Sequence, residues 1–237
     1  MSENIKKITK AFKVDLDSRE DQSIILKPNA RPFNNQAHQV NEVAKKIAEK
    51  IYKLIKDAKH PNDGIILNHN KIKEVFFSPF KPQLKNAQVF LSHSHADKNK
   101  ALKVKNYLES KTNHRVFIDS LFWDYKDDVL NELEKYDNTS KIKDAFTLIL
   151  RESLQDMIEK CPYFVFLQSN NSVSFNQDLS HITYSAWIYE ELKIAHSIRE
   201  SHPTPMMENM QVSHDISPFL ESLETITLKE LSRIINS

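Results

Sequence analysis

Glu191 is an acidic residue in the middle of the apolar face of a helix predicted at 185–199. Each residue turns a helix by about 100°, which places five apolar side chains within roughly 60° of Glu191. They are Trp187, Ile188, Ile194, Ala195 and Ile198. A carboxylate among such neighbours must be paired, neutralised or open to a cleft, where it can stabilise a developing positive charge. The alternative is a carboxylate at the edge of the face, with its oxygens in water.

Polar residues follow three short apolar runs of the chain. The runs are 87–92, 115–119 and 163–169, and they alternate with helical patterns. This alternation is typical of a parallel sheet that is covered on both faces. In such sheets, ligands bind beyond the carboxyl ends of the strands. Those ends carry the candidate binding residues, which are Ser92, His93, Ser94, His95, Asp119, Ser120, Gln168 and Ser169.

Three segments together resemble a Toll/interleukin-1 receptor (TIR) domain. They are the runs VFLSHSHAD at 89–97 and VFID at 116–119, and the Trp187-x-x-x-Glu191-Leu192 motif. The resemblance covers the chain from about Ala87 to its C-terminus and implies a flavodoxin-like α/β fold, a parallel sheet flanked by helices. One branch of this family cleaves NAD+ with the Glu four residues after the Trp, which is Glu191 here. The other branch consists of non-catalytic interaction modules.

The resemblance also implies roles for residues around the expected cleft. Trp187 packs beside the pocket in this family, although a core Trp fits its apolar neighbours equally well. We expect Phe122 and Trp123, in a polar loop at 120–126, to stack on a ring of the nucleotide or to anchor the loop. Asp119 is expected to orient this loop or to contact a ribose. The expected donors to a diphosphate are Ser92, Ser94 and His95.

We therefore expect NAD+ nucleosidase or ADP-ribosyl cyclase activity, with NAD+ as the substrate and no cofactor. Cleavage of the nicotinamide–ribose bond develops oxocarbenium-like charge on the sugar, which one carboxylate can stabilise. Nicotinamide leaves as a neutral molecule, so no general acid is required. Resemblance to bacterial members implies antiphage defence, through NAD+ depletion or a cyclic ADP-ribose signal sensed by a downstream effector. It also implies self-association through the TIR domain, with the helix at 38–59 as a further candidate surface.

A rival motif is the His93-x-His95-x-Asp97 run, which is similar to the metal-binding run of metallo-β-lactamase-fold hydrolases. Two imidazoles and a carboxylate just beyond a strand can hold a zinc centre. Lys98, however, occupies the place where that motif usually carries a further His. That fold is also rich in glycine and β-structure, whereas this chain is mostly helical in pattern. A metal-dependent hydrolase is therefore the distant alternative, and no metal site is expected.

Composition limits the remaining classes of function. The 33 basic and 32 acidic residues provide no global field for nucleic acids or membranes. The one cysteine, Cys161, excludes a disulfide within the chain and fits a reducing compartment. No segment has the pattern of a signal peptide or a membrane span, which predicts a cytoplasmic protein. The single glycine, Gly64, excludes Gly-rich phosphate-binding loops.

Residues 1–84 are expected to form an extension to a TIR domain at 85–237. Residues 1–35 are polar and contain turn-forming prolines, whereas apolar residues recur at helical spacing over 38–59. This helix either packs against its own domain or mediates self-association. Other expected features are an extra helical segment at 136–152, a long polar loop at 170–184, faint strands at 209–212 and 225–228, and a final helix at 229–235.

Overall fold

The computed structural model describes most of the chain, namely residues 10–26, 36–57, 69–79, 86–136, 140–175, 180–200 and 213–237. The chain forms two compact units. The sheet unit comprises Met1–Asn29, Asn86–Ser120 and Gln155–Ser237, and the helical unit comprises Ala30–Lys85 and Leu121–Leu154. Among the described residues, no helix combines the length and the apolar character needed to cross a bilayer.

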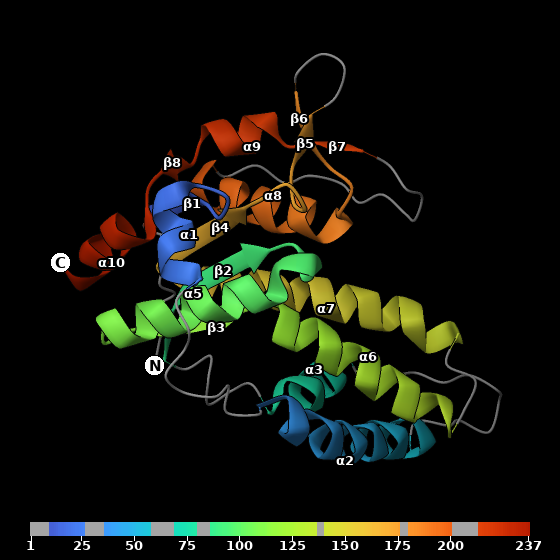
Figure 1. Ribbon diagram of the computed structural model, residues 1–237. Coiled ribbons are helices and arrows are strands. Elements are labelled where there is room, and N and C mark those ends of the chain that lie inside the picture. Colours follow the sequence, from blue (N-terminus) through green and yellow to red (C-terminus); the bar gives the residue numbers. More distant parts are fainter. Residues whose placement is uncertain are drawn as a thin grey trace. The chain divides into compact units, whose positions relative to one another are not determined.

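A five-stranded sheet with the order β3-β2-β4-β1-β8 forms the centre of the sheet unit (Figure 1). Its strands are β1 (Lys10–Asp15), β2 (Ala87–His93), β3 (Arg115–Ile118), β4 (Tyr163–Gln168) and β8 (Glu224–Thr225). Every pairing in this sheet is parallel. β2 and β4 are almost continuously buried, as expected for strands covered on both faces. The predicted parallel α/β fold and its three predicted strands are therefore confirmed.

The N-terminal strand β1 lies inside the sheet, between β4 and β8. It pairs with β4 over its whole length, from Lys10 opposite Tyr163 to Asp15 opposite Gln168. Residues 1–84 were expected to form an extension with one helix at 38–59, whereas β1 and the helix α1 (Arg19–Ile25) belong to the sheet unit. The order β3-β2-β4 matches the first three positions of a flavodoxin-like sheet, and β1 takes the fourth position.

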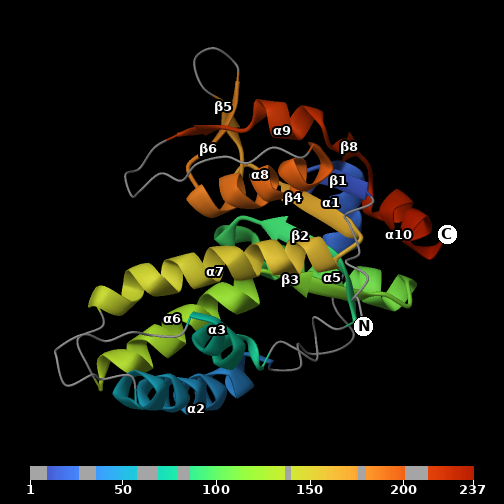
Figure 2. The same ribbon diagram turned by 180° about the vertical axis from the view of Figure 1, so that it is seen from behind.

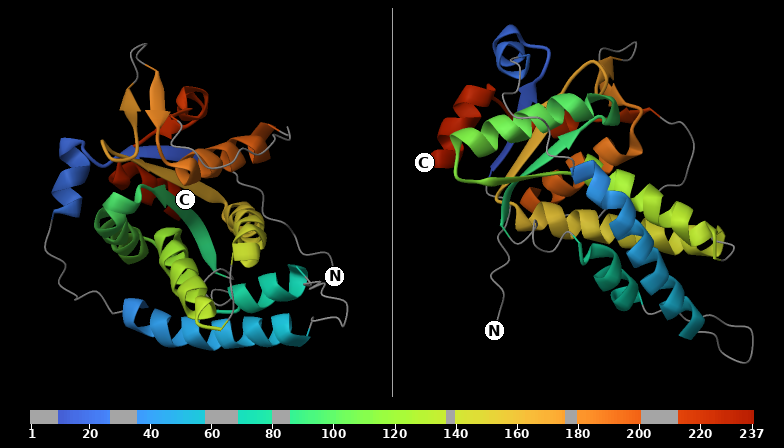
Figure 3. Two further views of the ribbon diagram at one scale, coloured as in Figure 1. Left: turned by 90° about the vertical axis from the view of Figure 1, so that its right-hand side faces the viewer. Right: turned by 60° about the horizontal axis from the view of Figure 1, so that its bottom comes forward.

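Helices cover both faces of the sheet. Figure 3 shows α1 and α5 (Lys98–Lys111) on one face and α8 (Ala186–Glu200) on the other. Figure 2 shows the same elements from behind the view of Figure 1. In α5, the buried residues Ala101, Val104 and Leu108 recur at the three- and four-residue spacing of a helix face. The short 3-10 helix η1 (His95–Asp97) joins β2 to α5.

The C-terminal part of the sheet unit agrees with the sequence in outline. The final helix is confirmed as α10 (Leu228–Asn236), which begins at a capping box formed by Thr227 and Glu230. β8 overlaps the strand expected at 225–228 but is only two residues long, because α10 begins at Leu228. The short helix α9 (Ser217–Glu221) precedes β8. The strand expected at 209–212 lies outside the described residues.

A small antiparallel sheet stands in place of part of the long loop expected at 170–184. Its strands are β5 (Ser174–Phe175), β6 (His181–Thr183) and β7 (His214–Asp215), in the order β5-β6-β7. The expectation of an irregular loop is therefore wrong for these residues. Short polar strands such as these carry too little apolar alternation to be recognised in a sequence.

The helical unit contains α2 (Gln36–Asp57), α3 (His69–Phe77), α6 (Ser120–Glu134, from Leu121) and α7 (Ser140–Lys160, up to Leu154). α2 confirms the helix predicted at 38–59, and its apolar residues are buried within the chain, which favours intrachain packing over self-association through this face. These residues are Ala44, Ile47, Ala48, Ile51 and Ile55. The expectation of a polar loop at 120–126 is wrong, because these residues form the first turns of α6. Tyr125 in α6 is buried and donates a 3.0 Å hydrogen bond to the carbonyl of Phe76.

Candidate functional site

The candidate site lies where the strand order of the sheet reverses. From β2 the chain moves to β3 on one side, and later to β4 on the other side of β2. The register places His93 of β2 opposite Leu167 of β4, so the carboxyl ends of these two strands lie together. In doubly wound sheets, this reversal is where ligands bind. The residues at the end of β2 are therefore the first candidates for a ligand-binding site.

Glu191 points from α8 to the end of β2 and exposes 0% of its surface. Ser92 Oγ donates a 2.5 Å hydrogen bond to Glu191 Oε2. Ile188, Ile194 and Ala195 on the same helix are buried, as the helical spacing predicts. Trp187 is half-buried, one turn before Glu191. The neighbouring Glu190 contacts Lys193 on the same helix, with 3.7 Å between Glu190 Oε1 and Lys193 Nζ.

Asp119, which directly follows β3, is the second acid of the site. It is buried, and a hydrogen bond joins its carboxyl group to that of Glu191. Burial, followed by the charge of Asp119 and this hydrogen bond, raises the pKa of Glu191 well above its ordinary value, and the bond from Ser92 opposes the rise only in part. The surroundings of Glu191 therefore favour its neutral form, in line with one of the three outcomes expected for an acid on an apolar face.

His93 is the basic partner of Asp119. Its Nδ1 lies 2.8 Å from Asp119 Oδ1, and the imidazole is fully buried. Burial by itself lowers the pKa of His93, but the Asp119 charge and contact outweigh it, so that the pKa is raised overall. Ser92, His93, Asp119 and Glu191 thus form one buried polar cluster, which we call the acid cluster.

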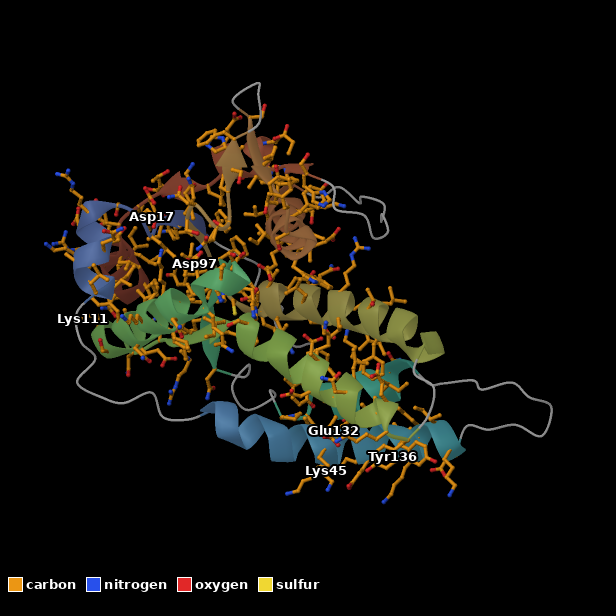
Figure 4. All side chains as sticks on the ribbon, turned by 45° about the vertical axis from the view of Figure 1, so that its right-hand side comes forward. Asp17, Lys45, Asp97, Lys111, Glu132 and Tyr136 are labelled. Atoms are coloured by element: carbon orange, nitrogen blue, oxygen red, sulfur yellow. The ribbon has the colours of Figure 1, made fainter. Side chains whose placement is uncertain are left out.

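A separate polar network ties together the chain segments that follow β1, β2 and β4. Buried Asp97 accepts hydrogen bonds from Ser169 Oγ and, at 3.0 Å, from Asn171 Nδ2. Lys100 Nζ lies 3.4 Å from Asp97 Oδ1 and 3.2 Å from Asp17 Oδ1, and Figure 4 labels both aspartates. All of these groups have partners within the network. It therefore holds the carboxyl ends of these strands in place rather than offering open groups to a ligand.

The remaining predicted binding residues are not brought together by the structure. Ser120 is buried, Ser94 is half-buried and His95 is exposed. Phe122 and Trp123 belong to α6 in the helical unit instead of a loop, and their side chains lie outside the described residues. Only part of the expected binding set, namely the end of β2 and Asp119, meets Glu191.

The metal-binding alternative has no support in the side-chain arrangement. His93 contacts Asp119, whereas Asp97 is held by Ser169 and Asn171, so the residues of the His-x-His-x-Asp run diverge. Within the described ranges, no group of three His, Cys, Asp or Glu side chains is placed to hold a metal ion. The run therefore supplies members of two different polar clusters.

The pairing of Asp119 with Glu191 was not foreseen in the sequence. The two residues come from different elements, and their contact depends on the order of the strands. Comparison of the chain with protein-family models, curated proteins and solved structures found no match. The chemistry of the acid cluster and the resemblance of its short motifs therefore carry the functional argument.

Proposed function

We propose that this chain is a TIR-type NAD+ nucleosidase or ADP-ribosyl cyclase in which Glu191 is the catalytic residue. The observation that carries the proposal is the fixed position of Glu191 at the strand-order reversal, where Ser92 at the end of β2 orients its carboxyl group. The parallel sheet provides the setting in which such folds bind nucleotides. NAD+ is proposed as the substrate because the motifs at 89–97, 116–119 and 187–192 resemble those of NAD+-cleaving TIR domains.

The chemistry requires one carboxylate beside the ribose. The bond between the ribose carbon and the nicotinamide nitrogen breaks, and its electron pair leaves with nicotinamide, which becomes neutral. The positive charge that remains on the sugar is stabilised by the Glu191 anion. Water then attacks the ribose carbon and loses a proton to give ADP-ribose, or an atom of the same nucleotide attacks to give a cyclic product. Of the two products, we favour the cyclic one as a signal for a downstream effector in antiphage defence.

Access to Glu191 requires a change in the resting protein, because its carboxyl group is completely enclosed. We propose that self-association through the TIR domain opens the site. The expected result is a specific activity that rises with protein concentration. A monomer in light scattering, with the same activity per molecule at every concentration, would rule out activation by assembly. A loss of activity on deletion of residues 1–60 would not show a role of these residues in self-association, because the deletion also removes strand β1 from the sheet.

The direct test is chromatography of NAD+ incubated with the purified protein at several concentrations, with and without a crowding agent. The proposal predicts release of nicotinamide together with an ADP-ribosyl product. Mass spectrometry identifies that product, since cyclic ADP-ribose is lighter than the linear form by one water. Linear ADP-ribose alone would leave simple NAD+ depletion as the function and exclude the cyclic signal.

The second candidate is a TIR interaction module without turnover. It is favoured by the complete burial of Glu191 and by its raised pKa, which fit a carboxyl group that serves only the fold. This candidate predicts intact NAD+ under every condition of assembly. It also predicts that Glu191→Gln leaves partner binding unchanged as long as the fold is retained.

A further inference from the structure

The acid cluster contains two carboxyl groups and one imidazole that are all withdrawn from water. Glu191 is fully buried, and Asp119 and His93 each expose only 3% of their surface. Moving ionised groups into such an environment is unfavourable unless their charges cancel. The hydrogen bond between Glu191 and Asp119 requires a proton on one of the two acids. A single His93 cation can balance only one of the two carboxylates, so one proton on the acids leaves the cluster without net charge.

The position of His93 decides which acid is ionised. Its Nδ1 lies 2.8 Å from Asp119 Oδ1, so a cationic imidazole pairs directly with the Asp119 carboxylate. Glu191 instead accepts a hydrogen bond from the neutral hydroxyl of Ser92. A proton on Glu191, an anionic Asp119 and a cationic His93 give a cluster without net charge.

We infer that Glu191 and Asp119 share a single proton, held on Glu191 in the resting protein, and that the buried His93 imidazolium is the counter-charge that sets this state. His93 and Asp119 are then positioning residues that act through Glu191. This assignment concerns the protonation of the resting cluster and holds with or without a substrate. Only its catalytic consequence rests on the proposed function.

In catalysis, this arrangement lets Glu191 become negatively charged without exchanging a proton with water. When positive charge develops on the ribose, the O–H bond of Glu191 breaks and an O–H bond forms on Asp119. Glu191 becomes the anion that faces the sugar, and the total charge of the cluster is unchanged. A shift of one proton along an existing hydrogen bond is sufficient. The resting protein meanwhile avoids an unpaired buried carboxylate.

Other charged groups around the cluster do not alter this assignment. Among the described residues, the charge that acts on His93 besides Asp119 is that of Asp97, and it also favours the cation. On α8 itself, Glu190 lies 3.7 Å from Lys193. The other elements packed against α8 bring His181 from β6 and Glu221 from α9. In the part of the chain that the structure describes, Asp119 is the charged group that shifts the pKa of Glu191.

The protonation of His93 is tested by NMR of the imidazole rings in the unliganded full-length protein. We expect His93 to keep its second ring proton to a higher pH than a histidine in a short unstructured peptide, which serves as the reference. In Asp119→Asn, His93 should lose this proton at a lower pH than in the wild type, because burial then dominates. A wild-type His93 that is neutral at pH 6.5 would overturn the inference. The wild-type measurement alone decides the inference, so the test does not depend on the folding of a variant.

The protonation of Glu191 is tested by infrared spectroscopy of the same protein at pH 7. We expect a C=O band of a protonated carboxyl group in the wild type and in Glu190→Gln, and its loss in Glu191→Gln. Absence of the band from the wild type would overturn the inference. NAD+ cleavage by a protein without the band would leave the proposed function standing alone. A protein with the band that never cleaves NAD+ would refute the function and keep the shared proton.

Discussion

Ser92 and Glu191 are 99 positions apart in the sequence and are joined by a 2.5 Å hydrogen bond from the Ser92 hydroxyl to Glu191 Oε2. Ser92 belongs to β2 and Glu191 to α8, so this bond connects the sheet to the helix that covers it. It fixes one oxygen of a buried acid at the point where the strand order reverses. Both the stability and the proposed activity of the protein depend on this contact.

Glu191→Gln is expected to stabilise the protein at neutral pH. The pKa of Glu191 is raised in the folded state, so between pH 4.5 and that raised value the native protein holds one proton more than the unfolded chain. The free energy of unfolding of the wild type therefore falls as pH rises across this interval, by about 1.4 kcal/mol per pH unit, whereas glutamine removes this dependence. Thermal unfolding between pH 4 and 8 measures the difference. Parallel curves for Glu191→Gln and the wild type would contradict the raised pKa.

Ser92→Ala is expected to weaken both the fold and the proposed activity. The lost hydrogen bond should lower the free energy of unfolding by about 1–2 kcal/mol and the rate of nicotinamide release by about tenfold. Ser94→Ala is the matched control, because Ser94 is half-buried and makes no capping hydrogen bond to η1. Urea unfolding and NAD+ turnover are the measurements. Equal losses in the two variants would remove Ser92 from the site.

Asp97→Ala should destabilise the sheet unit more than Asp17→Ala. Asp97 is buried, and its loss leaves Ser169 and Asn171 without their acceptor, at a cost of about 3 kcal/mol. Asp17 is half-exposed and accepts from Lys100, so its loss should cost at most about 1 kcal/mol. Chemical denaturation of both variants provides the comparison. The reverse order would show that this network does not hold the strand ends.

Phe12→Ala tests whether β1 is an integral strand of the sheet. Phe12 is almost fully buried in β1, so truncation to alanine should cost about 3–5 kcal/mol. Lys10→Ala, at the exposed start of the same strand, should change stability by less than about 0.5 kcal/mol. The measurement is urea unfolding followed by far-UV circular dichroism. A Phe12→Ala protein as stable as the wild type would mean that residues 10–15 are dispensable for the sheet.

The sequence predicts those elements that carry a strong local pattern. β2 and β4 are continuous apolar runs, and α2 and α5 have apolar residues at helical spacing. β1 escaped detection because lysines at both 10 and 13 interrupt a short strand. The first turns of α6, at 120–126, were expected to be a loop, although Tyr125, Val129 and Leu133 recur every four residues and are buried.

The position of Glu191 could be predicted from its helix alone, but its partners could not. Burial of this residue follows from the apolar face that it shares with Ile188 and Ala195. The contacts with Ser92 and Asp119 depend on how the β2 and β3 ends and α8 are arranged in space. No local pattern determines such long-range contacts. Their chemistry therefore became visible only in the folded chain.

Glu191 is proposed to cleave the nicotinamide–ribose bond of NAD+. The most direct test is nicotinamide release by the assembled protein in three forms, namely the wild type, Glu191→Gln and Glu190→Gln. Glu190 is the matched control, because it is the adjacent acid on α8 and pairs with Lys193. We predict that Glu191→Gln stays folded and releases no nicotinamide, while Glu190→Gln retains most of the wild-type rate. Equal release by the wild type and Glu191→Gln would contradict the assignment.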